Sequence, residues 1–433
     1  MTDALIRRMA ALPKVDVKPL SSVCRYGNLE QDAINAGREL GVDIVVDGAL
    51  QRLKNRVRVS VRMLDVTSGQ QVWDAHFDND FADIFTIQDA IAEHAASALM
   101  NRLTAEQRAE VRRRPTRDPL AYQAYVTGWS ALTRPGSHSL EVALRALNEA
   151  VTRDPAFALA HARLCHCYTL LGLFGIQAPH DVFPKAHAAI LKALDLDPEL
   201  AEAHAHLGHI RALYYFDDKG SERALQRAMQ INPRSSLVHH YVGLRLLTKG
   251  QIDDALAAVR RAQTIEPLAP IFSANIGMIY YYGRRYDEAV MQLQATLEMD
   301  PGFDHARSVL GRTYLRLGDN RRAIEEFKRR RTITIGSVAD LPAAHALAGH
   351  RDKTIAELRH LLATARKRYV SPYDLATIYA ALDDTHRAID WLARAVEIRD
   401  PTIPLLPIDP ALDSLRADPR FIDLVASPRA FTA

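Results

Sequence analysis

The residues of this chain that could hold a metal ion are concentrated near residue 165. Cys165, His166 and Cys167 are consecutive, and His161 lies one helical turn before them, so four soft ligands fall within seven residues. On a helix, residues 161 and 165 share a face, whereas 166 and 167 point elsewhere. A buried free cysteine packs well as a small apolar side chain. We therefore interpret Cys165 as a packing residue and predict no metal site.

Two basic runs are the candidates for phosphate contacts. They are residues 112–114, which are all arginine, and residues 328–331, which read Lys-Arg-Arg-Arg. Both fall at the ends of expected helices, where cations interact favourably with the helix dipole. A solvated face is the better interpretation of both runs than a phosphate site.

Motifs of the common enzyme classes are absent from the sequence. It contains no Gly-x-x-x-x-Gly-Lys-Ser/Thr phosphate loop, no Gly-x-Gly-x-x-Gly after a strand, no His-Glu-x-x-His and no Gly-x-Ser-x-Gly elbow. We therefore predict that the chain is not an enzyme, and that it has no catalytic residues and no cofactor.

The composition is that of a soluble globular protein. Of the 433 residues, 25% are charged and 48% are hydrophobic. The net charge of +3 is too balanced to predict a nucleic-acid or membrane surface. Three cysteines form no disulfide framework, and no apolar run approaches the roughly 20 residues of a membrane helix. We predict a cytoplasmic protein that does not contact the membrane.

A repeat of 34 residues positions these side chains. Asn232-Pro233, Glu266-Pro267 and Asp300-Pro301 place their prolines 34 residues apart. Two sets of small residues keep the same step, namely Gly243, Gly277 and Gly311, and Ala255, Ala289 and Ala323. Small residues at these intervals allow two helices to approach closely, and proline ends the second helix of each unit. The period predicts an array of helix–turn–helix units.

On these residues the chain resembles the tetratricopeptide repeat family. The resemblance implies a right-handed α-solenoid with about six regular repeats over residues 116–334, followed by degenerate repeats and a capping helix over residues 335–433. We count eight helix pairs, with an insertion of about nine residues from Leu173 in the second repeat. In this alignment His204 takes the same repeat position as His161, and we interpret His204, His206 and His209 as packing residues rather than metal ligands.

The resemblance also implies a binding surface, because the first helix of each unit lines a concave groove in this family. In three central units the groove positions are apolar and aromatic with an arginine edge, a composition that favours protein binding. These candidate groove residues are His240, Leu244, Met278, Tyr281, Tyr282, His305, Arg312 and Arg316. We expect a protein or peptide partner. The lysines and asparagines of a chaperone-type carboxylate clamp are absent from these positions.

Residues 1–115 lack the 34-residue period and alternate between helix and strand patterns. We expect helices over residues 3–12 and 31–40, a strand over residues 15–19, three antiparallel strands over residues 43–77, and a long helix from Asp83. The motifs Gly37-Arg-Glu-Leu-Gly-Val-Asp43, Arg56-Val-Arg-Val-Ser-Val-Arg-Met-Leu-Asp65 and Asp83-Ile-Phe-Thr-Ile-Gln-Asp-Ala-Ile91 resemble the TolB amino-terminal and FlgO-like domains. The match begins inside the first helix of that family, so we expect a partial α/β domain with three to four strands.

The fold class predicted for the whole chain is mostly α with a small α/β domain. In relatives with this layout, the missing front carries a winged-helix, nucleotide cyclase or protein-kinase module. We therefore expect a non-enzymatic scaffold that forms the sensing or regulatory part of a bacterial signalling or transcription regulator, and that reaches nucleic acid only through a missing or separate output domain. Two alternatives remain open. One is a regulator that binds DNA directly, and the other is a regulatory protein related to adenylate cyclases.

Overall fold

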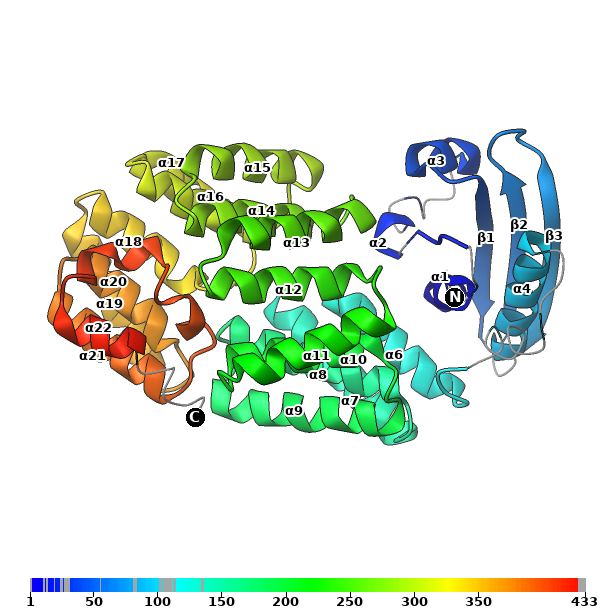
Figure 1. Ribbon diagram of the computed structural model, residues 1–433, viewed down its shortest axis with the longest axis horizontal. Coiled ribbons are helices and arrows are strands. Elements are labelled where there is room, and N and C mark those ends of the chain that lie inside the picture. The colour runs from blue at the N-terminus through cyan, green and yellow to red at the C-terminus, as the bar shows by residue number, and fades with distance from the viewer. Residues whose placement is uncertain are drawn as a thin grey trace. The chain divides into compact units, whose positions relative to one another are not determined.

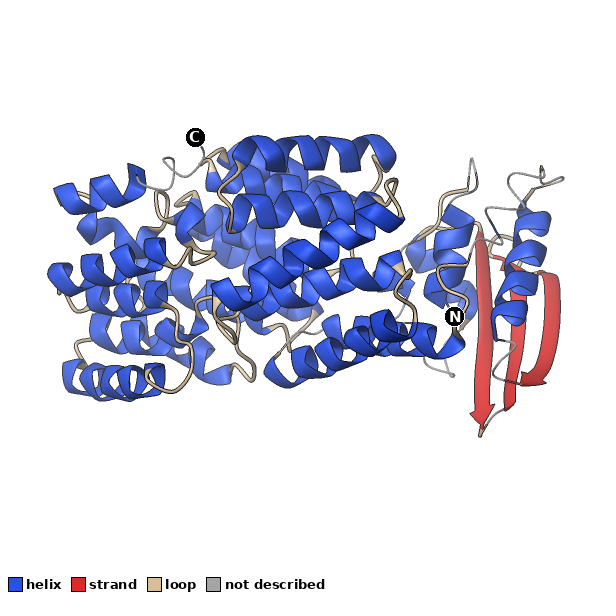
Figure 2. Cartoon of the chain, turned by 90° about the horizontal axis from the view of Figure 1, so that it is seen from below, coloured by secondary structure: helices blue, strands red, loops and turns tan. Residues whose placement is uncertain are grey.

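The computed structural model describes residues 2–10, 12, 15–18, 20–23, 26, 32–54, 56–80, 84–100, 104, 111, 114–133 and 136–426 (Figure 1). These residues form two compact units. The first comprises residues 1–123 with the turn 266–269, and the second comprises residues 124–265 and 270–433. The chain is mostly helical, with one small antiparallel sheet, as the fold class predicted (Figure 2).

The first unit is built around a three-stranded antiparallel sheet in the order β1-β2-β3. Its elements are α1 (Thr2–Ala10), α2 (Leu20–Val23), α3 (Ala33–Leu40), β1 (Ile44–Leu53), β2 (Arg56–Asp65), β3 (Gln71–Asp80) and α4 (Ile84–Leu99). The central strand β2 alternates, because Val57, Val59, Val61 and Met63 are buried on one face. On the other face, the arginines of β2 form cross-strand ion pairs, such as Arg62 with Asp47.

The strand expected over residues 15–19 is not formed. Residues 15–18 have no regular secondary structure, and in the described residues the sheet contains only the three strands of the meander. Val15 and Val17 instead pack as part of a loop against the core of Met9, Leu12 and Met63. The alternation of apolar and polar residues was short, and Pro19 has no N–H to donate to a neighbouring strand. The positions of the two valines are therefore determined by their burial against the core and not by strand pairing.

In the described residues the repeat array contains eight helix pairs, as expected, and its first helix begins at the end of the first unit. They are α6 (Pro119–Leu132) with α7 (Ser137–Arg153), α8 (Ala158–Leu173) with α9 (Pro179–Leu196), α10 (Ala201–Leu213) with α11 (Asp218–Ile231), α12 (Ser236–Thr248) with α13 (Ile252–Ile265), α14 (Pro270–Tyr282) with α15 (Tyr286–Met299), α16 (Asp304–Arg316) with α17 (Asn320–Arg329), α18 (Ser337–Leu347) with α19 (Arg351–Ala365), and α20 (Pro372–Ala381) with α21 (Thr385–Glu397). Successive first helices lie side by side, from α8 through α10, α12, α14, α16 and α18 to α20.

The glycines that repeat along the array mark where the two helices of a pair meet. A Cβ atom added to Gly243, Gly277 or Gly311 would lie less than 3.0 Å from the side chain of the partner helix. The matching alanines, Ala255 and Ala289, have no exposed surface. Close approach therefore explains why these positions are small.

The acidic or amide residue before each proline also has a structural reason. Asp154, Asp197, Asn232 and Asp300 end their helices in extended conformations, as the residue before proline does. Each also accepts a hydrogen bond from the backbone N–H two residues later, with distances between 3.0 and 3.2 Å. This Asx turn links one helix pair to the next.

The carboxyl-terminal residues do more than cap the last pair. The helix α22 (Pro419–Ala426) packs against α21, but the two 3₁₀ helices before it, η3 (Ile403–Leu405) and η4 (Pro410–Leu415), run back along the array. The element η3 contacts α10 and α12, and η4 contacts α20 and α21. We call residues 401–415 the return segment.

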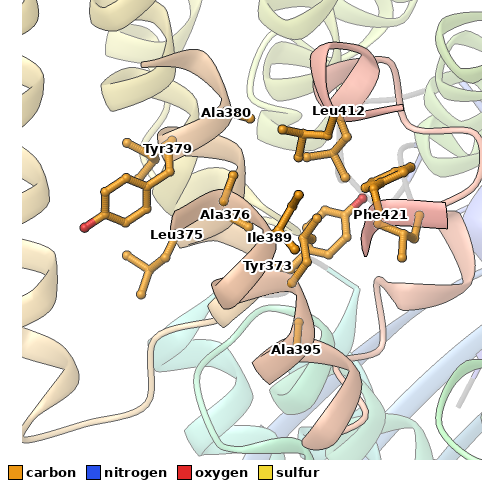
Figure 3. Close-up of a cluster of buried hydrophobic side chains, with 14 of the residues drawn as sticks. Tyr373, Leu375, Ala376, Tyr379, Ala380, Ile389, Ala395, Leu412 and Phe421 are labelled. Carbon is orange, nitrogen blue, oxygen red and sulfur yellow. The ribbon is translucent and has the colours of Figure 1, made fainter. Parts of the chain in front are cut away.

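A buried apolar cluster fixes the return segment. It joins Tyr373 of α20 and Ile389 of α21 to Leu412 of the return segment and Phe421 of α22 (Figure 3). Phe216, from the turn between α10 and α11, belongs to the same cluster. Residues from the third and the eighth helix pair thus share one core, so the array closes on itself.

Candidate functional site on the first helices of the array

The eight candidate groove residues lie on three neighbouring first helices. His240 and Leu244 are on α12, Met278, Tyr281 and Tyr282 are on α14, and His305, Arg312 and Arg316 are on α16. Two of them, His240 at 8% and Tyr281 at 3% exposure, are buried. The other six are half-buried, so most of the predicted groove remains partly accessible to a partner.

The histidines of this set belong to a buried polar chain that crosses several repeats. The Asn275 amide donates to His240 Nε2 at 2.6 Å, and His305 Nε2 donates to Asn275 Oδ1 at 3.0 Å. Burial lowers the pKa of His240 to about 4 and that of His305 to about 4. The chain is therefore held in its neutral form, which suits a packing role between repeats.

The same polar chain continues toward the amino-terminal repeats. The Tyr241 hydroxyl lies 3.1 Å from His206 Nδ1, and the Tyr241 ring stacks on His209 with centroids 4.1 Å apart. The His206 ring lies in turn beside the His166 ring, with centroids 5.0 Å apart and the rings tilted by 32°. Burial lowers the pKa of His209 to about 3. We call His166, His206, His209, His240 and His305 the histidine ladder.

The tyrosines and arginines of the set surround a cavity of about 180 Å³ in the second unit. Its lining includes Tyr281, Tyr282, Arg312 and Arg316 from the predicted groove. It also includes residues of α18, α20 and the return segment that the sequence did not suggest, among them Asp340, Tyr373, Asp374, Asp409 and Ser414. The return segment thus forms one wall of the predicted groove.

Both arginines of the cavity already have partners within the chain. Arg312 Nε donates to Asp340 Oδ1 at 2.6 Å, and its Nη2 donates to the Ile335 carbonyl at 2.6 Å. Arg316 Nη1 donates to the Pro410 carbonyl of the return segment at 2.9 Å. Arg284 and Asp413 form a further ion pair between α14's end and the return segment. Of the expected arginine edge, Arg312 therefore binds residues of the seventh helix pair and the turn before it, and Arg316 binds the return segment.

The basic run at residues 328–331 is only partly a solvated face. Arg330 is largely buried, pairs with Asp340 and donates to the Ser337 carbonyl at 3.0 Å. Arg329 pairs with Glu326 of its own helix. In the other run, Arg112 and Arg113 lie outside the described residues, and Arg114 pairs with Asp89. Arg330 thus links the last regular repeat to the first degenerate one.

The fold places Cys165, Cys167 and His161 in different surroundings. Cys165 and Cys167 are fully buried, and burial raises the pKa of each thiol to about 12, so neither is a thiolate. His161 Nε2 donates to the Pro155 carbonyl at 3.0 Å. In the part of the chain that the structure describes, no three His, Cys, Asp or Glu side chains are arranged as ligands of one metal ion.

His161 belongs to a recurring bond that the sequence reasoning missed. His204 donates to the Pro198 carbonyl and His239 to the Pro233 carbonyl, at 2.8 and 2.9 Å. Arg307 makes the same bond to the Pro301 carbonyl at 2.6 Å. Each donor lies six residues after its proline. A search for polar residues at a constant distance from the repeated prolines would have found this bond.

Asp374 is the second residue that the sequence did not single out. It lies on α20, lines the cavity and is 6% exposed. Burial raises the pKa of its carboxyl to about 8, and the charge of Asp400 acts in the same direction. An acidic residue within a helix that is otherwise apolar, Pro372–Ala381, was the available signal.

Comparison with known proteins agrees with this geometry. Residues 242–302 and 274–333 match the family model for the tetratricopeptide repeat. The repeats within residues 242–333 are tetratricopeptide repeats. The matched stretch contains seven of the eight candidate groove residues, and His240 lies two positions before it.

Two relatives bear the names of an adenylate cyclase and of a transcriptional regulator. A Rhizobium meliloti (strain 1021) protein that bears the name adenylate cyclase 3 is 31% identical over 164 residues, which are 38% of this chain and 28% of that protein. The transcriptional regulator HilA of Salmonella typhimurium is 26% identical over 166 residues, 38% of this chain and 30% of the regulator. The matches therefore span less than a third of each relative.

Among solved structures, the human IFIT1 dimer with m7Gppp-AAAA resembles this chain with a TM-score of 0.48 and 16% identity. The alignment covers 64% of this chain and 72% of the IFIT1 chain. Within the described residues, no helix combines the length and hydropathy that a bilayer span requires.

Proposed function

We propose that this chain is the regulatory scaffold of a bacterial signalling or transcription regulator, and that its tetratricopeptide array binds a segment of a partner protein. The observation that carries the proposal is the array itself. Tetratricopeptide repeats are protein-interaction modules, and stacked repeats present an extended surface to a partner. The names of the two relatives support the regulatory role.

In this proposal the partner segment contacts the half-buried side chains of α12, α14 and α16. Leu244, Met278 and His305 lie outside the cavity lining, while Tyr282, Arg312 and Arg316 lie within it. Apolar, aromatic and arginine side chains together favour a protein partner over a nucleic acid, which would select a basic surface.

The proposal has three parts along the chain. Residues 1–115 form a partial α/β domain related to the TolB amino-terminal and FlgO-like domains, residues 116–334 form the regular repeats, and residues 335–433 form the degenerate repeats with their cap. In this proposal the array itself does not contact nucleic acid, which is reached only through an output module of the regulator, and the chain acts in the cytoplasm. The helix–sheet core around Met63 and Ala92 supports the first part.

The test needs a defined partner. A bacterial two-hybrid screen with the wild-type chain would supply partner fragments, and isothermal titration calorimetry with purified proteins would confirm each one. The double variant Met278→Glu/Arg316→Glu alters the proposed surface. Met291→Glu, at an exposed position of α15, is the matched control.

We expect the affinity of the double variant for the partner to be at least about tenfold lower. The reason is that the two glutamates place negative charge on a surface that is apolar and basic in the wild type. The control should bind like the wild type. Equal binding by both variants would place the partner elsewhere, and failure of every screened fragment to bind the purified chain would contradict the scaffold proposal.

A further inference from the structure

The cavity contains a buried carboxyl group that has no partner. In the part of the chain that the structure describes, no donor bonds the Asp374 carboxyl, although its backbone N–H donates to Ser371 Oγ at 3.3 Å. Its neighbours differ. Asp340 pairs with Arg312 and Arg330, and Asp409 accepts a 2.8 Å hydrogen bond from the Tyr373 hydroxyl. Among the described residues that line the cavity, Asp374 is thus the buried carboxyl to which no group donates a hydrogen bond.

The Asp374 oxygens are not among the fully enclosed polar atoms that lack a partner, so the carboxyl is open to a ligand in the cavity that it lines. The pKa of the Asp374 carboxyl, raised to about 8 mainly by burial, means that the group is mostly protonated and neutral near pH 7. An opposite charge placed beside it would favour the ionised form. The group is therefore able to become a counter-ion when a cation enters.

The rest of the lining favours a cation over an anion. Asp409 and, at the exposed rim, Asp383 add negative charge, while the charges of Arg312 and Arg316 are directed to Asp340 and to the Pro410 carbonyl. Three tyrosines, Tyr281, Tyr282 and Tyr373, contribute aromatic surface, which also attracts cations. An anionic ligand would meet unpaired carboxyl groups.

The size of the cavity limits the ligand. Its volume of about 180 Å³ lies below the roughly 300–1,000 Å³ of sites for drug-sized molecules. The return segment closes one side with Ala411 and Ser414, so a long peptide cannot pass through. The space suits a short chain with a charged end.

We propose that this cavity binds a small organic cation with a primary ammonium or guanidinium group, and that the carboxylate of Asp374 is its counter-ion. On binding, Asp374 loses its proton to solvent, and the ligand's charge replaces it. The site shares Tyr282, Arg312 and Arg316 with the proposed partner surface, but binding of the cation needs no partner chain. Since the return segment forms part of its wall, a bound ligand would also stabilise the closed array.

The test is isothermal titration calorimetry of the full chain near pH 7 with agmatine and with n-butylamine, and with 1-butanol as the uncharged analogue. Each titration is repeated in two buffers with different ionisation enthalpies. We expect both cations to bind, 1-butanol not to bind, and close to one proton to be released for each cation bound. Proton release identifies the ionisation of Asp374 and does not depend on the partner protein.

The variant Asp374→Asn keeps the shape of the side chain but cannot ionise. We expect it to lose about thirtyfold or more in affinity for n-butylamine, as when one member of a buried charge pair is removed, and to show no proton release. Asp352→Asn, at an exposed position of α19 outside the cavity lining, is the matched control and should bind as the wild type does.

Three results would overturn the proposal. They are no heat with either cation at millimolar concentration, equal affinity for n-butylamine and 1-butanol, and an Asp374→Asn variant that binds unchanged. If that variant does not fold, as circular dichroism would show, proton release by the wild type decides alone, and binding without release rejects Asp374 as the counter-ion.

Discussion

Eight histidines of the repeat array fall into two groups that differ in their surroundings. His161, His204 and His239 donate to proline carbonyls at the start of their repeats. The histidine ladder instead lies between first helices, where burial holds it neutral. One residue type therefore serves two structural purposes, and its abundance needs no metal site to explain it.

The histidine ladder predicts a stability that falls in mild acid. The pKa values of His209, about 3, and His240, about 4, lie below the value of about 6.5 in an unfolded chain, and that of His206 is also well below it. Between about pH 4 and pH 6.5 the unfolded chain therefore binds protons that the folded chain does not. Each group contributes about 1.4 kcal/mol per pH unit, and the stability is complete above about pH 6.5.

Asp374 acts in the opposite direction, because its pKa of about 8 in the folded chain lies above that of an unfolded aspartate. It cancels the effect of about one of the five histidines of the ladder, each of which has a lowered pKa. The free energy of unfolding measured with urea should thus fall steeply between pH 7 and pH 5. In His240→Gln the slope of this free energy against pH should correspond to about one proton fewer. His386→Gln, on the surface, is the control. A slope of zero, or an unchanged slope in His240→Gln, would contradict this account.

Residue-level prediction from the sequence succeeded where the repeat constrained the side chain. The repeated glycines and alanines were placed correctly because a helix–helix contact recurs at a fixed interval. Arg330 and Asp374 were not recognised, because their surroundings come from segments outside the period, including α18 and the return segment. The exposed part of the candidate groove stays a prediction.

At the scale of the elements, the helix pair is the unit that the sequence encodes most directly. Gly311 of α16 faces the ring of Phe327 of α17, and the two other central glycines face Leu293 and Val259. The partner side chain varies while the glycine is constant. The contact therefore requires that the first helix has no side chain at this position. On the second helix, apolar side chains of different sizes occupy the space.

Gly311→Ala should destabilise the array. Alanine gains up to about 1 kcal/mol in helix propensity over glycine. Here its Cβ would overlap the Phe327 ring, and overpacking costs about 1–3 kcal/mol, so we expect a net loss of about 1 kcal/mol. Gly302→Ala is the control, because its Cβ would meet only Asp300 at an ordinary distance of 3.4 Å. A urea midpoint for Gly311→Ala at or above that of the wild type would show that the helices separate freely.

The elements of the amino-terminal unit were less predictable than those of the array. The meander over β1, β2 and β3 followed from β-branched alternation, and the end of α3 from Gly41, which adopts a positive φ of 63°. Residues 15–18 were wrongly expected to form a strand, since a short alternation cannot distinguish a strand from a loop that buries two valines.

At the scale of the second unit, closure by the return segment is the main feature that the repeat pattern does not contain. Ile408 lies beside Gly250, Asp413 pairs with Arg284, and Arg399 lies over the Tyr214 ring at 5.9 Å. These contacts join residues more than one hundred positions apart in sequence. Repeat arrays are usually stabilised only between neighbours, so closure should make distant repeats unfold together.

Leu412→Asp tests this closure. Leu412 is fully buried, and a carboxylate there would release the return segment, at a cost of several kcal/mol. Amide hydrogen exchange measured by mass spectrometry should then rise at the ends of α12 and α14, as well as in α20. Ile422→Asp, at an exposed position of α22, is the control. A rise confined to α20 and α21 would show that the central repeats do not depend on the return segment.

The return segment also restricts how this protein can evolve. An array that is open at its end can gain or lose a unit by duplication or deletion, because each unit meets only its neighbours. Here one extra unit between α15 and α20 would carry Asp413 away from Arg284 and Ile408 away from Gly250. The number of repeat units in that part of the array is therefore fixed. The protein can then diversify only by substitutions on the existing helices.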